Sequence, residues 1–241
     1  MNWQSEKVVV LGGSSGIGLA TVSRLTAAGA NVVAIGRDQD KLDKALAGLE
    51  GPGRAVGEAL DCTDRAALDR FFGRVGPIDH LLLTLSGGEG GGRFDELDLT
   101  ALRRGFEAKV WPQLEAAQAG LPALRHDGSL TFVTAISARI ANPGTAGLGA
   151  INGALECMIG SLARELAPLR VNAVSPGVID TAWWDRFPAS VKTDLFRQQA
   201  ETLPVGRVGQ AQDVAHALQF LMENTFMTGA IIECDGGLRL L

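Results

Sequence analysis

Short apolar runs alternate along the chain with longer segments in which apolar residues recur every three or four positions. The short runs are rich in valine, isoleucine and leucine, which predicts buried strands, and the longer spacing predicts helices. Strands are expected at Lys7–Leu11, Asn31–Ile35, Arg54–Leu60, His80–Leu85, Leu130–Thr134, Arg170–Ser175 and Ile231–Cys234. Helices are expected at Ile17–Gly29, Asp38–Leu49, Asp64–Val75 (with Thr63 as its N-cap), Thr100–Leu124, Ala146–Ala167 and Ala211–Met222.

A helix between successive strands carries the chain back to the same edge of a sheet, so the strands should be parallel and covered on both faces. The pattern predicts an α/β fold, a single doubly wound (Rossmann-type) domain over residues 1–241 with a seven-stranded sheet. Residues 182–205 interrupt the alternation of strands and helices, and they contain Trp183, Trp184 and Phe187. Because ligands bind beyond the carboxyl ends of parallel strands, we expect these residues to form a flap over a substrate pocket. Two short helices packed into the core are the alternative.

A glycine-rich segment follows the first strand and opens the first helix. Gly12 allows a tight turn, Gly16 allows close approach to a pyrophosphate, and Gly18 allows the helix to pack closely on the sheet. The helix N-terminus would offer amides and partial positive charge to phosphates. The segment therefore predicts a dinucleotide site, a tight turn without a ligand being the alternative. The predicted contacts in it are Gly12, Ser14, Ser15, Gly16, Ile17 and Gly18.

The second strand ends in Gly36 and Arg37. An acidic residue there would bind the adenosine 2′-hydroxyl, whereas an arginine can pair with a 2′-phosphate. NADP(H) is therefore the expected cofactor. The alternative is that Arg37 is a solvated neighbour of Asp38 and Asp40.

The composition of the chain limits its possible partners and catalytic mechanisms. The 241 residues carry 22 basic and 27 acidic side chains, a net charge of −5 that gives no footprint for nucleic acid or a membrane surface. No apolar run approaches the roughly 18 residues that a membrane-spanning helix needs. Three distant cysteines favour a reduced, cytoplasmic protein, and His80, His126 and His216 fall in no metal-ligand spacing. The chain contains no tyrosine, which excludes any mechanism that needs a phenol.

Several blocks resemble the short-chain dehydrogenase/reductase family. They are the segments at 12–18, 170–181, 204–209, 213–215 and 228–237, together with Asp61 after the third strand. The resemblance covers nearly the whole length and implies a small-molecule substrate and a homo-oligomer, either a dimer or a tetramer. It also implies cofactor contacts at Asp61, Cys62, Gly87, Pro176, Gly177, Ile179 and Thr181.

The family's catalytic residues are replaced here. The alignment puts Leu148 at the tyrosine position, where it would line the substrate pocket, and Asn152 at the lysine position. Lys109 stands where the family has a helix asparagine. Ser137 is aligned with the family's serine, and Thr134 is the fallback.

Three interpretations of this active site remain open. In the first, Lys109 supplies the proton, Ser137 hydrogen-bonds the carbonyl and Asn152 holds the nicotinamide ribose; in a dry pocket the pKa of Lys109 would fall toward neutrality. In the second, the substrate or water supplies the proton, because loss of a general acid slows a hydride transfer without preventing it. In the third, the chain binds NADP(H) without turnover, as a sensor or assembly partner. A structural alternative for Lys109 is a partly solvated helix residue.

Overall fold

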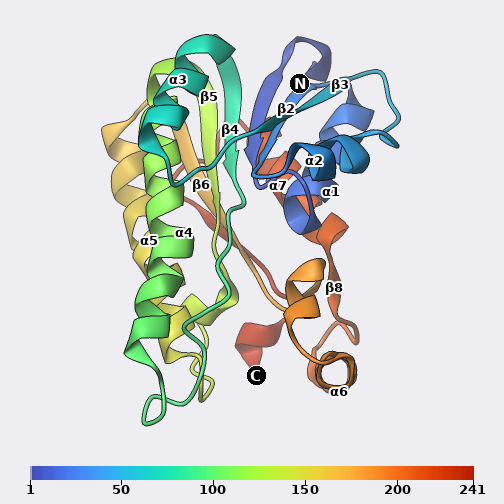
Figure 1. Ribbon diagram of the computed structural model, residues 1–241, viewed down its shortest axis with the longest axis vertical. Helices are drawn as coiled ribbons and strands as arrows, with labels where there is room; N and C mark the ends of the chain where they lie inside the picture. Colours follow the sequence, from blue (N-terminus) through green and yellow to red (C-terminus); the bar gives the residue numbers. More distant parts are fainter. Residues whose placement is uncertain (1) are drawn as a thin grey trace.

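Seven parallel strands form one sheet in the computed structural model, which describes residues 2–241 (Figure 1). Their order is β3-β2-β1-β4-β5-β6-β9, and every adjacent pair runs parallel. The doubly wound fold predicted from the sequence is confirmed. The strands are β1 (Lys7–Leu11), β2 (Asn31–Gly36), β3 (Arg54–Ala59), β4 (Ile78–Leu83), β5 (Leu124–Val133), β6 (Arg170–Pro176) and β9 (Ile231–Cys234).

Helices cover both faces of the sheet and enclose two apolar layers (Figure 1). One layer packs α3, α4 and α5 against the sheet, with Phe71, Phe132 and Leu155 among its buried residues. The other packs α1, α2 and α7 against the opposite face, with Leu25 and Leu218 buried. The helices are α1 (Gly16–Ala28), α2 (Gln39–Leu46), α3 (Arg65–Val75), α4 (Leu99–Gly120), α5 (Ala146–Glu165), α6 (Ala189–Thr202) and α7 (Ala211–Glu223).

The strand order reverses at β1, which lies between β2 and β4. Loops leaving the carboxyl ends of β1 and β4 therefore diverge to opposite faces, and the space between them is where a ligand crevice is expected in such a sheet. This is the position at which the glycine-rich segment after β1 begins.

The segment predicted to form a flap stands outside the main sheet (Figure 1). It contains a 3-10 helix, η4 (Ala182–Arg186), and the longer helix α6. Its two ends are joined by a separate parallel pair, β7 (Ile179–Asp180) with β8 (Gly209–Gln210). The sequence did not predict this pair, because two-residue strands carry no periodicity.

One sequence prediction about helices is wrong. The N-cap of α3 is Asp64, whose carboxylate accepts a hydrogen bond from the amide of Ala67 at 3.0 Å, and the Thr63 hydroxyl bonds Asp61 instead.

Helix α5 is long and apolar enough to cross a membrane by length and composition, which the apolar runs of the sequence did not suggest. One face of α5 nevertheless packs on the sheet, as in the core helix of an α/β domain.

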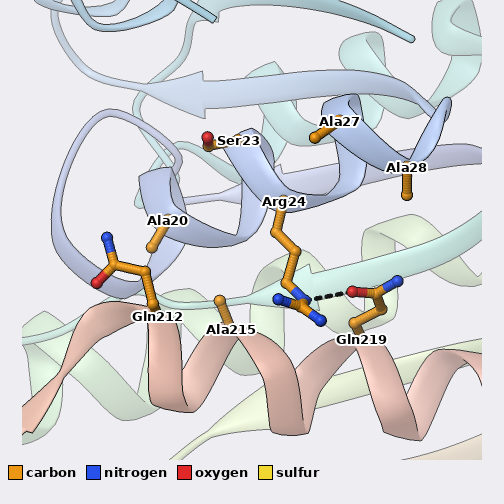
Figure 2. A pocket seen from close by; sticks show the side chains of 8 residues that line it. All are labelled: Ala20, Ser23, Arg24, Ala27, Ala28, Gln212, Ala215 and Gln219. Carbon is orange, nitrogen blue, oxygen red and sulfur yellow. Dashed lines mark hydrogen bonds between the residues drawn. The ribbon is translucent and has the colours of Figure 1, made fainter. Parts of the chain in front are cut away.

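A shallow groove of about 450 Å³ lies between α1 and α7 (Figure 2). The Arg24 guanidinium crosses it and donates a hydrogen bond to the Gln219 side chain. Small side chains let the two helices approach closely here. The groove is lined by Ala20, Ser23, Arg24, Ala27, Ala28, Gln212, Ala215 and Gln219.

Contact between α1 and β1 depends on Gly18. A Cβ at this position would overlap the carbonyl oxygen of Gly12 and lie 2.7 Å from the hydroxyl of Thr84. We expect Gly18→Ala to lower the free energy of unfolding by about 1–3 kcal/mol, because α1 must move off the sheet. Urea unfolding followed by circular dichroism measures the change.

Gly153→Ala is the matched control. Gly153 also lies inside a helix, but a Cβ added to it would meet no atom within 4 Å. Alanine there should stabilise the protein by up to about 1 kcal/mol. Equal effects of the two substitutions would show that helix propensity, and not the contact with Gly12, governs position 18.

Candidate active site

The loop between β1 and α1 lies at the crevice where the strand order reverses. Gly12 and Gly16 have φ values of +89° and +53°, which glycine adopts without strain. The amides of Gly12 and Gly13 both donate to the carbonyl oxygen of Ile35 at 2.9 Å and fix the loop against β2. Ser15, the N-cap of α1, makes no side-chain bond to the first-turn amides. These amides can therefore bind an anion, aided by the helix dipole.

Polar side chains from the ends of β2 and β3 gather beside this loop. The Ser14 hydroxyl lies 3.2 Å from the point that a Cβ on Gly36 would occupy. Thr63 donates to the Asp61 carboxylate through its amide at 3.0 Å and its hydroxyl at 2.8 Å. These bonds, together with the positive charge of Arg37, lower the pKa of Asp61. The structure thus brings Arg37 and Asp61 together at one end of the crevice.

Cys62, which follows Asp61 in the sequence, is buried at this end of the crevice. Burial, together with the negative charge of Asp61, raises the pKa of its thiol to about 12. The thiol stays protonated at neutral pH and is suited to apolar packing, not to nucleophilic chemistry.

The other end of the crevice is formed by the chain that leaves β6. Thr181 lies next to Gly16, since a Cβ added to that glycine would stand 3.5 Å from the Cβ of Thr181. The amide of Gly177 donates to the carbonyl oxygen of Cys234 at 3.0 Å. The segment that contains Pro176, Gly177, Ile179 and Thr181 is therefore held beside the glycine-rich loop, as predicted from the sequence.

Ser137 and Asn152 face each other between the end of β5 and α5. The Asn152 side-chain amide donates to the Ser137 hydroxyl at 3.1 Å and to the Leu148 carbonyl oxygen at 2.9 Å. Asn152 is only 4% exposed, and its side-chain oxygen has no hydrogen-bond partner within residues 2–241. Such an atom is costly to bury unless a bound molecule donates to it. Leu148 lies one turn away, against Gly91.

Thr134 belongs to a different group of side chains. Its hydroxyl is 2.8 Å from the Glu156 carboxylate and 3.2 Å from the carbonyl oxygen of Val174, and the residue is buried. Ser175 and Arg139 also donate to Glu156, each at 2.8 Å. The Thr134 hydroxyl is thus occupied, which favours Ser137 as the hydroxyl that meets a substrate.

Lys109 reaches this group from α4. It is 7% exposed, and its ammonium donates to the carbonyl oxygen of Thr134 at 3.0 Å. The alternative of a partly solvated helix lysine is therefore wrong. Burial lowers the pKa of Lys109 to about 8, and the charge of Glu156 opposes that shift. In this conformation the ammonium faces Thr134 and not Ser137.

The flap closes against the loop that follows β4. The Trp183 indole donates to the carbonyl oxygen of Gly87 at 2.8 Å, and the Trp184 indole donates to that of Ile179 at 2.9 Å. The ring centroids of Trp184 and Phe187 are 5.8 Å apart. The three predicted aromatic pocket residues therefore meet one another, and Trp183 also meets the predicted cofactor contact Gly87, whereas Leu148 lies against Gly91.

Sequence reasoning missed two buried polar residues of the site. The Glu156 carboxylate accepts hydrogen bonds from Thr134, Ser175 and Arg139. The Gln113 side-chain amide donates to the carbonyl oxygens of Leu85 and Val133, at 2.8 and 3.3 Å. The signal for Glu156 is its position four residues after Asn152, on the buried face of α5. The partners come from distant segments, so spacing alone could not identify them.

Known proteins resemble the chain over its whole length. A family model whose description is enoyl-(acyl carrier protein) reductase matches residues 12–239. Cis-4-hydroxycyclohexanecarboxylate dehydrogenase from Sinomonas cyclohexanicum is 32% identical over 243 residues, covering 95% of this chain and 94% of the relative. L-xylulose reductase from Homo sapiens is also 32% identical, covering 96% and 95%. The crystal structure of a small-chain dehydrogenase in complex with NADPH superimposes with a TM-score of 0.85 at 31% identity, covering 98% of this chain and 99% of that chain.

The lowered pKa of Lys109 predicts a pH-dependent stability. Between about pH 8, its folded value, and pH 10.5, its ordinary value, the unfolded chain holds a proton that the folded chain has lost. The free energy of unfolding should therefore rise with pH across this window, by roughly 3 kcal/mol in total, and the Lys109 contribution should be flat below it. Urea unfolding of wild type and Lys109→Met at several pH values measures this difference.

Lys44→Met provides the control, since Lys44 is exposed on α2 and should leave the wild-type pH slope unchanged. The same slope in wild type and Lys109→Met would contradict a depressed pKa at Lys109.

Proposed function

Because this chain belongs to the short-chain dehydrogenase/reductase family, we propose that it is an NADP(H)-dependent oxidoreductase acting on a small carbonyl or alcohol. The observation that carries the proposal is the Asn152 side-chain oxygen, buried in the crevice without a partner in the described chain. A ribose hydroxyl of the cofactor can donate to it. The relatives' names, a hydroxycyclohexanecarboxylate dehydrogenase and a xylulose reductase, support a small oxygenated substrate.

The crevice suits a phosphorylated dinucleotide along its length. The first-turn amides of α1 face the pyrophosphate position, and Asn152 stands at the ribose position. Arg37, with the Ser14 hydroxyl nearby, supports the preference for a 2′-phosphate over a 2′-hydroxyl. NADPH, when bound, supplies hydride from C4 of its nicotinamide.

Ser137 is the proposed contact of the substrate carbonyl. Its oxygen accepts a hydrogen bond from the Asn152 amide, so its own hydrogen is free to donate to the substrate oxygen. Asn152 thereby fixes the direction of that hydroxyl. A donor held in this way stabilises the negative charge that develops on the oxygen.

The proton requires a source other than a phenol, since the chain has no tyrosine. Lys109 is one source, but its ammonium must leave the Thr134 carbonyl oxygen to deliver a proton. Water or an acidic group of the substrate is the other, and it needs no rearrangement. In that second case Lys109 keeps its proton, and its buried positive charge favours a developing oxyanion.

A second candidate is an NADP(H)-binding protein with little or no turnover. The bond from the Trp183 indole to Gly87 favours it, because this ring closes the flap onto the loop beside the predicted nicotinamide position. A flap that stays closed would exclude a substrate while leaving the adenosine end open to the cofactor.

Arg37→Asp tests the cofactor assignment. We expect it to raise the Kd for NADPH by about 10- to 100-fold and to change that for NADH by less than about threefold, because the lost charge-assisted bonds involve only the 2′-phosphate. Isothermal titration with both cofactors measures this. Arg54→Asp makes the same charge change at the amino end of β3 and should alter neither affinity. Equal losses for both cofactors would refute the role of Arg37.

Ser137→Ala tests the chemistry. With a panel of aldehydes, ketones and diones, we expect kcat to fall by about 10²–10³-fold while the Kd for NADPH is unchanged. Ser161→Ala, on the exposed side of α5, is the control. Turnover unaffected by Ser137→Ala would remove Ser137 from the mechanism. No NADPH consumption by wild type across the panel, despite tight NADPH binding, would favour the binding protein.

A further inference from the structure

Arg186, at the end of η4, lies beside the loop that follows β4. Its guanidinium occupies the space into which a side chain at Gly88 would project. It also stacks on the Trp183 ring, with Cζ 4.4 Å from the ring centroid, and its Nε donates to the Trp183 carbonyl oxygen at 2.8 Å. These contacts hold the Arg186 side chain against the glycine-rich loop that follows β4 (residues 87–92, the glycine loop).

The charge of Arg186 is not neutralised by a carboxylate in residues 2–241. Neighbouring cations are paired: Lys192 lies 3.2 Å from both Asp180 and Asp185, and Arg104 lies 2.7 Å from Glu89. Arg186 uses only Nε for its protein hydrogen bond, so neither terminal nitrogen has a hydrogen-bond partner in residues 2–241, although Nη1 lies against Gly88. Such a pair of parallel donors matches the two oxygens of a carboxylate.

The glycine loop places this cation near the candidate reaction centre. Gly87 bonds the Trp183 indole, Gly88 adjoins the guanidinium, and Gly91 lies against Leu148. Gly88 and Gly91 are three residues apart, a span of at most about 11 Å. Arg186 and Leu148 therefore contact the same short loop, and Leu148 is joined to Ser137 through the Asn152 side-chain amide.

Resting on the proposed function, we propose that Arg186 binds a carboxylate of the substrate, so that the natural substrate is a small carbonyl or alcohol that carries an acid group. A single guanidinium with two free nitrogens fits a monoanion. A phosphate dianion would require a second cation, and Lys192, the nearest one on the flap, is held by two aspartates.

Paired probes test the proposal. The probes are 4-oxopentanoate and 4-oxocyclohexanecarboxylate, each compared with its methyl ester, titrated into protein saturated with NADP⁺ and assayed for turnover with NADPH. We expect wild type to bind the acids at least tenfold more tightly than the esters. Arg186→Gln should weaken binding of the acids by 10- to 100-fold and leave the esters and NADPH unchanged.

Two further variants separate recognition from folding. Gly88→Ala should displace the guanidinium and reproduce the loss for the acids, although Arg186 itself is intact. Arg197→Ala removes a charge from α6, where Arg197 pairs with Asp194 at 3.2 Å, and should change neither acid nor ester binding.

Each remaining outcome overturns the proposal. Equal affinity of wild type for acid and ester, no saturable binding of either acid, or equal losses for acid and ester in Arg186→Gln would each show that Arg186 only fastens the flap. Failure of the proposed function is distinguished by NADPH itself, which would then either not bind or bind without being consumed. The acid titration of cofactor-free protein still tests Arg186, because Trp183 and Gly88, not the cofactor, place its side chain.

Discussion

The close approach of α1 to the end of β1 is the constraint on which the rest of the structure depends. Gly18 rests on the Gly12 carbonyl, and the Thr84 hydroxyl donates to the carbonyl oxygen of Leu11 at 2.7 Å, so helix, strand and the end of β4 meet without intervening side chains. This contact leaves the first-turn amides pointing into the crevice where the strand order reverses. The same arrangement places the loop between β1 and α1 beside the end of β4, from which the glycine loop runs to meet the flap at Gly87. Closing this contact with side chains would remove both the amide donors and the crevice.

The alignment made from the sequence predicts that one positive charge has moved between helices. In that alignment Asn152 of α5 stands at the family's lysine position and Lys109 of α4 at its asparagine position, as if amide and ammonium had exchanged places. An ammonium buried behind β5 requires a countercharge, because an unpaired buried cation is strongly destabilising. Glu156 provides it, and Arg139 together with the hydroxyls of Thr134 and Ser175 satisfies the rest of that carboxylate. As a result, a neutral amide, Asn152, lies beside Ser137. The positive charge of Lys109 lies instead at the carbonyl oxygen of Thr134.

Local signals determined most of the fold and little of the active-site network. The β-branched runs and glycine stops predicted all seven strands of the main sheet and the start of α1, because each depends on residues adjacent in sequence. The cap of α3 was placed one residue early, since Thr63 and Asp64 are equally good caps and only the competing bond to Asp61 decides between them. The partners of Lys109 and Glu156 are Thr134, Arg139 and Ser175, which come from three separate stretches of the chain, and no periodicity encodes which buried polar groups meet. Arg186 was missed for the same reason: its place depends on Trp183 and on a glycine almost a hundred residues earlier.

The flap combines a cluster of aromatic side chains with a cation, Arg186, and the two groups select substrates differently. Trp183, Trp184, Phe187 and Phe196 pack edge-to-face or tilted against one another, and such apolar contacts do not discriminate by substrate charge. A guanidinium resting on an aromatic face is already partly desolvated, so an arriving carboxylate displaces little of its hydration. The chain's net charge of −5 repels anions at a distance, but this repulsion is screened beyond about 8 Å at physiological ionic strength. Within that range the unpaired charge of Arg186 attracts an anion, whereas Lys192 and Arg104 are paired with carboxylates.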